Sequence, residues 1–246
     1  SSLEQQQDYL LGVPEGADLK ETPISDPENH YYKMTGQSTL QSNGTLTGEF
    51  TINTEGQSDG ALRSMFTRNF KSNWDNALEQ KIRSVLPDIE ISEMSYSKPY
   101  NYQKNNMQIT IKYKIPNYAL NTEEEIMFTP VIARELFKNV NYHLYFNPDM
   151  KDRKYAFRDR CSRLVELKET ITLPEYSEVA YLPKVKSIDG ASATYTGGYK
   201  INNNKLTLNE KITFKKRKYK AREWENFRNV VKAHKTMAEE KVILKK

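Results

Sequence analysis

The sequence predicts a mainly β fold that also contains helices, the α+β class, in a chain of 246 residues. Aromatic residues make up 11% of the chain, with 16 tyrosines among them, and this composition favours sheet. Several segments alternate apolar and polar residues, most strictly 107–115. Two others, 59–86 and 220–237, repeat apolar residues at helical spacing. We therefore expect two β-sandwich-like or sheet-plus-helix units, each with one long amphipathic helix.

The predicted elements divide the chain into three parts. Residues 1–35 carry three prolines and many acids, which indicates an extended N-terminal segment or linker. A first β-rich unit follows over 36–147 and a second over 148–246. The boundary between the units is predicted at 147–152, where turn-forming and charged residues gather.

The first unit begins with a hairpin signal, because Asn43 and Gly44 stand between runs of β-prone residues. A helix is then predicted over 59–86, ending before Pro87. Its apolar stripe recurs every four residues and consists of Leu62, Phe66, Phe70, Trp74, Leu78 and Ile82. Such a stripe is typical of a helix face packed on a sheet, so Trp74 is interpreted as a core residue. Strands are expected at 89–97 and 107–115.

The second unit contains more strand-like segments than the first. Alternating or β-rich runs are found at 164–173, 179–182, 191–201 and 206–214. The helix predicted over 220–237 follows them and carries Trp224 and Phe227 on its apolar side, and a short final strand is expected at 242–244.

Charge is distributed unevenly along the chain, which has a net charge of +5. Residues 1–60 hold ten acidic and two basic residues, whereas 211–246 hold thirteen basic and four acidic ones. The densest basic run, 215–222, lies between a predicted strand and a predicted helix and is interpreted as a solvated strand end that pairs with the acidic N-terminal part. No nucleic-acid partner is expected, because no recognition helix or aromatic sheet motif accompanies the charge.

The residue types present allow one kind of catalysis to be considered, which uses a cysteine nucleophile. Cys161 is the single cysteine, and nucleophilic catalysis requires one of the histidines His30, His143 and His234 within hydrogen-bond reach of it. Flanking arginines would lower the pKa of the thiol. The residues around Cys161 do not form a small-residue turn that exposes a nucleophile. A free-standing hydrolase that depends on Cys161 therefore stays an alternative, and Cys161 is interpreted as a packing residue.

No catalytic, metal-binding or cofactor-binding residue is predicted. The histidines do not share a spacing of three or four residues, the acidic run 123–125 lacks calcium-loop spacing, and Gly197-Gly198 lies inside a predicted strand. The sequence also lacks the run of about 20 apolar residues that a membrane-spanning helix needs. The chain begins at Ser1 without a methionine, which indicates that it is a piece of a longer polypeptide.

Four segments are distinctive: EQQQDYLLGVPEGADLKETPISDPENHYYK, NGTLTGEFTINTEGQSDGALRSMF, ITLPEYSEVAYLPK and YKAREWENFRNVVKAHKTMAEEKVILKK. Together they resemble the region after the transglutaminase-like core in large multidomain proteins of Bacteroidetes. In that family a papain-like core stands between two β-rich domains of unknown function. The pattern at 56–63 and the closing residues Tyr219, Trp224 and Phe227 carry most of the resemblance.

The resemblance implies that the catalytic Cys, His and Asp of such a protein lie before Ser1, since nothing around Cys161 matches the nucleophile motif. It also implies an extracytoplasmic location, in the periplasm or at the cell surface. The expected function is that of a non-catalytic C-terminal accessory region of a transglutaminase- or protease-like protein, which packs against or positions the core or binds a partner.

A carbohydrate- or cell-surface-binding β module is the alternative. The tyrosine-rich strands motivate it, and exposed aromatic side chains would support it.

Overall fold

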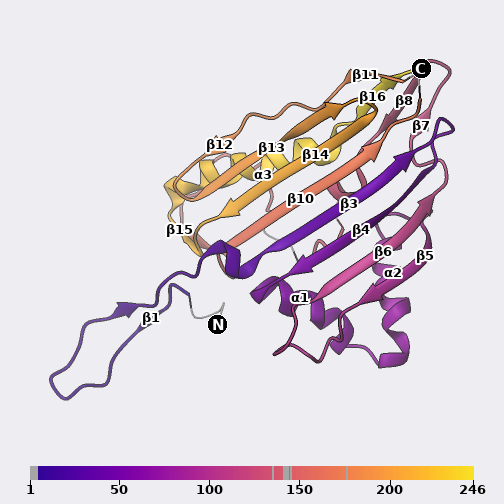
Figure 1. The fold of residues 1–246 in the computed structure, drawn as a ribbon. Helices are drawn as coiled ribbons and strands as arrows, with labels where there is room; N and C mark the ends of the chain where they lie inside the picture. The colour runs from indigo at the N-terminus through magenta and orange to yellow at the C-terminus, as the bar shows by residue number, and fades with distance from the viewer. Residues whose placement is uncertain (1–4, 135, 141–143, 145, 176) are drawn as a thin grey trace.

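The computed structural model describes residues 5–134, 136–140, 144, 146–175 and 177–246. Its centre is an eight-stranded sheet (Figure 1). In spatial order the strands are β12 (Ile188–Asp189), β13 (Ala193–Asn202), β14 (Lys205–Phe214), β10 (Arg163–Thr172), β3 (Tyr32–Leu40), β4 (Leu46–Thr54), β6 (Gln108–Ile115) and β5 (Glu90–Tyr96). The α+β class predicted from the composition and the alternating segments is confirmed.

The two halves of the chain meet in the middle of this sheet. Strands β3 and β10 pair in parallel, with Tyr32 opposite Val165, whereas the other neighbours in the sheet are antiparallel. The sheet thus continues in space across residues 147–152, where the sequence suggested a boundary between units. That segment is irregular and packs on the last helix, since Pro148 O accepts a hydrogen bond from Arg228.

Smaller sheets complete the β structure. A four-stranded sheet joins both halves again, and its order is β11 (Glu178–Tyr181), β16 (Val242–Lys245), β8 (Glu125–Phe128) and β7 (Leu120–Asn121). Two-residue strands pair as β15 (Lys218–Tyr219) with β9 (Phe157–Arg158), and as β1 (Asp8–Tyr9) with β2 (Lys20–Glu21). The final strand expected at 242–244 is confirmed as β16.

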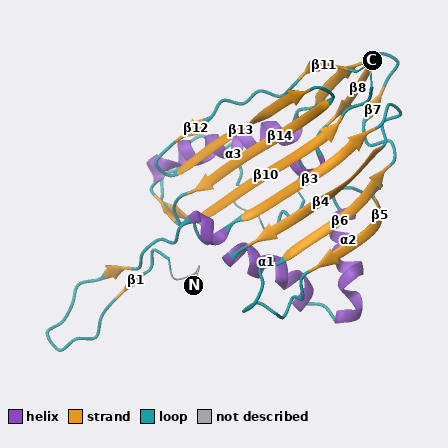
Figure 2. Ribbon diagram, in the orientation of Figure 1, coloured by secondary structure: helices purple, strands orange, loops and turns teal. Residues whose placement is uncertain are grey.

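The helices α1 (Gly56–Thr67), α2 (Trp74–Arg83) and α3 (Trp224–Glu239) lie together on the far side of the central sheet in Figure 2. Short 3-10 helices are η2 (Pro27–His30), η3 (Lys71–Asn73), η4 (Val131–Ala133) and η6 (Ala221–Glu223). The core fills the space between these helices and the sheet. The opposite face of the sheet is polar, because the residues that alternate with the buried ones are mainly Thr, Lys, Glu, Asn and Gln.

The long helix expected over 59–86 is wrong as a single element. The structure contains α1 and α2 instead, with η3 between them, and Phe70 of the predicted stripe is 82% exposed. The chain turns after Asn69, whose side chain bonds the α1 carbonyl of Met65. Asn and Ser in this stretch favour turns and helix ends over helix interiors, and the turn brings the Trp74 ring edge-on against Phe66, 5.8 Å between centroids.

The hairpin and the last helix agree better with the sequence. Strands β3 and β4 are joined by a turn at Asn43 and Gly44, in which Asn43 Oδ1 accepts the backbone N–H of Thr45 at 2.9 Å. Helix α3 runs through the predicted 220–237, starting four residues later. Its aromatic side chains pack against Phe157, which lies 5.3 Å from Trp224 and 5.2 Å from Phe227 between ring centroids.

Candidate functional site

Cys161 lies just before β10 and is 1% exposed. Its sulfur accepts a hydrogen bond from the guanidinium of Arg163, with Nη2 at 3.4 Å. Burial raises the pKa of the Cys161 thiol, and the nearby Arg163 only partly opposes this effect. Sequence reasoning expected the flanking arginines to lower the pKa, so this point is corrected: desolvation outweighs the attraction of the cation. The surroundings favour the neutral thiol, which is the unreactive form.

His30 belongs to the same buried polar cluster but does not bond Cys161 within the described part of the chain. Its Nδ1 accepts the backbone N–H of Gln57 at 3.1 Å, which requires a neutral ring. Burial, and secondly the positive charge of Arg163, lower the pKa of His30 to about 4. Arg163 donates to the Gln57 side chain and so links the two residues indirectly.

Gly56, at the start of α1, allows this cluster to close. Its φ is +58°, and a Cβ placed on it would collide with Asn29 O and His30 Nδ1. Glycine, the first residue of the pattern at 56–63, is therefore required at this position for backbone conformation and space.

His234 does not lie beside Cys161 but belongs to a different cluster. His234 lies on α3, where its Nδ1 is 3.3 Å from Glu210 Oε1, and Tyr195 donates its hydroxyl to the same oxygen at 2.9 Å. This second cluster ties α3 to the sheet. His143 lies outside the described residues. Among the described residues there is no group of three or more His, Cys, Asp and Glu that could hold a metal ion.

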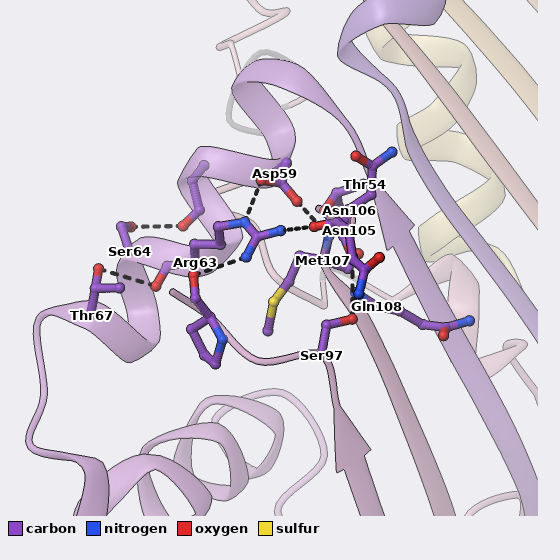
Figure 3. Close-up of polar contacts among 12 residues, drawn as sticks. Thr54, Asp59, Arg63, Ser64, Thr67, Ser97, Asn105, Asn106, Met107 and Gln108 are labelled. Carbon is purple, nitrogen blue, oxygen red and sulfur yellow. Dashed lines mark hydrogen bonds and ion pairs between the residues drawn. The ribbon is translucent and has the colours of Figure 1, made fainter. Parts of the chain in front are cut away.

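Asp59 and Arg63, on successive turns of α1, hold a loop that runs from 97 to 107 (Figure 3). Asp59 Oδ2 accepts Arg63 Nε at 2.5 Å, and its Oδ1 accepts the backbone N–H of Met107 at 2.5 Å. Arg63 donates to the carbonyls of Lys98 at 3.3 Å and Pro99 at 2.9 Å, and also to that of Asn105. The ion pair thereby fastens both ends of the loop to one helix.

The fastened loop presents two tyrosines to solvent. Tyr100 is 62% and Tyr102 is 69% exposed, and they border a hollow of about 590 Å³. The hollow is lined mostly by polar residues and glycines, namely Asn29, Glu55, Gly56, Asp59, Gly60, Arg63, Thr67 and Asn106, with Pro99. The Tyr100 ring rests 5.8 Å from the Trp74 ring, between centroids. We call these two side chains and the hollow the tyrosine site.

Sequence reasoning did not single out the tyrosine site. The sequence did contain one indication of exposed tyrosines. Two tyrosines lie within the polar stretch 97–107, which has few apolar residues to bury them. The pairing of Asp59 with Arg63 could also be read as an i, i+4 ion pair, but the loop that it holds could not be anticipated from its spacing.

Residues 7–24 form a hairpin that extends away from the body of the molecule, which we call the N-terminal arm (Figure 1). Six of its large apolar side chains are at least 39% exposed: Tyr9, Leu10, Leu11, Val13, Leu19 and Ile24. The backbone of the arm projects beyond the sheet and helices of the body in Figure 1. Apolar side chains gathered on one exposed segment differ from the singly scattered apolar residues of an ordinary protein surface.

The base of the arm is attached to the basic run 215–222. Gln6 Oε1 accepts the backbone N–H groups of Arg217 and Lys218, each at 2.9 Å. Lys218 Nζ lies 3.4 Å from Asp8 and 3.1 Å from Glu21. The predicted pairing of the basic run with the acidic N-terminal part is confirmed for these residues.

A family model and a solved structure each match part of this chain. Residues 124–244 match the family model described as "Domain of Unknown Function with solved-structure structure (DUF3858)". A crystal structure described as that of a "putative protease from Parabacteroides distasonis ATCC 8503" aligns at 13% identity over 51% of this chain, with a TM-score of 0.42. The aligned part spans 24% of that protein. No curated protein matches the sequence.

The match to a domain of unknown function covers residues 124–244, a range that contains neither the N-terminal arm nor the tyrosine site. Helices long and apolar enough to cross a membrane are absent from the described residues.

Proposed function

We propose that this chain is a non-catalytic accessory module that docks on another domain through its N-terminal arm. The observation that carries the proposal is the arm itself, which exposes six large apolar side chains on a projecting hairpin. Burying a leucine side chain fully contributes about 1.5–3 kcal/mol, so leaving several exposed is costly unless a partner covers them. Two further acids, Glu15 and Asp18, lie between the apolar residues, whereas Asp8 and Glu21 are paired with Lys218 at the base of the arm. A complementary surface is an apolar groove bordered by basic groups.

The resemblance to Bacteroidetes multidomain proteins suggests which partner this is. A transglutaminase- or protease-like core of the same polypeptide would lie close to the arm, and such proteins are placed in the periplasm or at the cell surface. We propose both for this chain, on the strength of the resemblance alone.

The docking role predicts that the arm is protected from solvent only in its natural context. We expect fast amide hydrogen exchange at residues 8–21 in the isolated chain and slow exchange in the full natural polypeptide. Replacing Leu10, Leu11 and Leu19 together by serine is expected to abolish that protection. Because these side chains are exposed, the free energy of unfolding of the isolated chain should change by less than about 0.5 kcal/mol each.

Phe70→Ser provides the matched control, since Phe70 is an exposed apolar residue of the body. It should leave the protection of the arm unchanged. Fast exchange of residues 8–21 in the natural polypeptide would contradict the docking role.

The absence of catalysis is a separate prediction. Purified chain is expected to show no amide hydrolysis and no glutamine–amine transfer, because the Cys161 thiol is buried and kept neutral. Cys161→Ala should lower the free energy of unfolding by about 1–2 kcal/mol through lost packing and have no other effect. A turnover that disappears in Cys161→Ala while the fold survives would establish a cysteine enzyme instead.

A further inference from the structure

The tyrosine site lies on the body of the molecule and takes no part in the docking role of the arm. Burial of an aromatic ring stabilises a fold because it removes a large apolar surface from water. Tyr100 and Tyr102 leave most of that surface exposed and so contribute little of this stabilisation. Tyr100 and Tyr102 are two residues apart and border one hollow. The hollow is open to solvent, so a ligand there would lie across the surface and leave one side exposed.

The two tyrosines are held in place before any ligand arrives. Arg63, 6% exposed, fixes the backbone on both sides of them through carbonyls of Lys98, Pro99 and Asn105. Within the loop, the N–H of Asn101 bonds Lys98 O at 3.0 Å and that of Lys104 bonds Asn101 O at 3.1 Å. A preformed loop loses little conformational entropy on binding, which favours recognition even by few contacts.

The chemistry of the lining selects the ligand class. The ring faces of Tyr100 and Tyr102 are apolar, while the amides of Asn29 and Asn106 and the carboxylate of Glu55 offer donors and acceptors at the same hollow. The Glu55 carboxylate disfavours an anion, since the other carboxylate, Asp59, is already paired with Arg63. The lining exposes both apolar and polar atoms, so a wholly apolar or wholly polar molecule would leave part of it without a partner. A neutral molecule with an apolar face and a rim of hydroxyls satisfies both kinds of surface. We propose that the tyrosine site binds a saccharide, with the tyrosine rings stacked on the C–H face of a sugar and the amides and Glu55 bonded to its hydroxyls.

The test uses the whole chain and a panel of soluble hexasaccharides of glucose, xylose, mannose and N-acetylglucosamine, each titrated calorimetrically to about 10 mM. We expect at least one to bind, and Tyr100→Ala with Tyr102→Ala to weaken it by about tenfold or more. The double phenylalanine variant keeps the ring faces and should retain most of the affinity.

Tyr155→Ala is the matched control, because Tyr155 is 81% exposed and does not line the hollow. Both tyrosines are exposed, so the alanine variants should fold, as circular dichroism would verify. Failure of the whole panel to bind overturns the proposal, and so does equal binding by the double alanine variant. Neither result bears on the docking role of the arm, which is measured by hydrogen exchange.

Discussion

Replacing Arg63 by leucine is expected to lower the free energy of unfolding by about 3 kcal/mol. The Arg63 and Asp59 side chains are only 7% and 14% exposed, so removing the guanidinium leaves a carboxylate poorly solvated and without its cation. The carbonyls of Lys98, Pro99 and Asn105 lose their donor at the same time. Urea unfolding of wild type and variant at neutral pH and one salt concentration measures the difference.

Arg83→Leu is the control for this substitution. Arg83 pairs with Glu79 at 2.7 Å with the same i, i+4 spacing, but both side chains are more than a third exposed, so the loss should stay below about 1 kcal/mol. The same two variants also test whether Arg63 holds the loop. Amide hydrogen exchange at 98–106 should become faster in Arg63→Leu and stay unchanged in Arg83→Leu. Equal losses for the two arginines would mean that the Asp59–Arg63 pair is not the fastening of the loop.

The sequence predicted the helices and strands whose formation depends on residues close together in the chain. Strict alternation located β6, the Asn43-Gly44 turn located the β3–β4 hairpin, and the helical spacing around Trp224 and Phe227 located α3. The predicted helix 59–86 failed at Phe70 because a four-residue apolar repeat fits one long helix and also two consecutive helices joined by a turn. The contact of Trp74 with Phe66 belongs to the second case, and it is a tertiary contact that the spacing does not reveal.

Features that depend on distant residues were not predictable. The parallel pairing of β3 with β10 joins positions about 130 residues apart, and nothing in either strand specifies a parallel partner. Glu169 illustrates the same limit: on β10 it occupies an inward position and is fully buried, bonded by Ser38 at 2.7 Å and by the N–H of Ile132 at 3.2 Å. A glutamate in a strand is normally read as solvent-facing. The tyrosine site depends likewise on a loop fixed by a helix 35 to 42 residues earlier.

Acid is expected to destabilise the chain through His30. Its folded-state pKa is lowered to about 4 from an ordinary 6.5, so the unfolded chain binds a proton more readily than the folded one between these values. The contribution is therefore fully present above pH 6.5 and is lost as the pH falls to 4, by up to about 3 kcal/mol. Protonation would also place a second positive charge beside Arg163 and remove the acceptor of the Gln57 N–H.

His30→Asn isolates this effect, because an amide oxygen can accept the Gln57 N–H but does not titrate. Urea unfolding of both proteins at pH 7, 5.5 and 4 should give curves that separate as the pH falls, with the wild type losing more stability than the variant. Carboxylates that protonate in the same range are common to both proteins and cancel in the difference. If the two stabilities fell in parallel, His30 would be protonating in the folded state near its ordinary pKa, and the closed packing of Gly56 against its ring would have to open in acid.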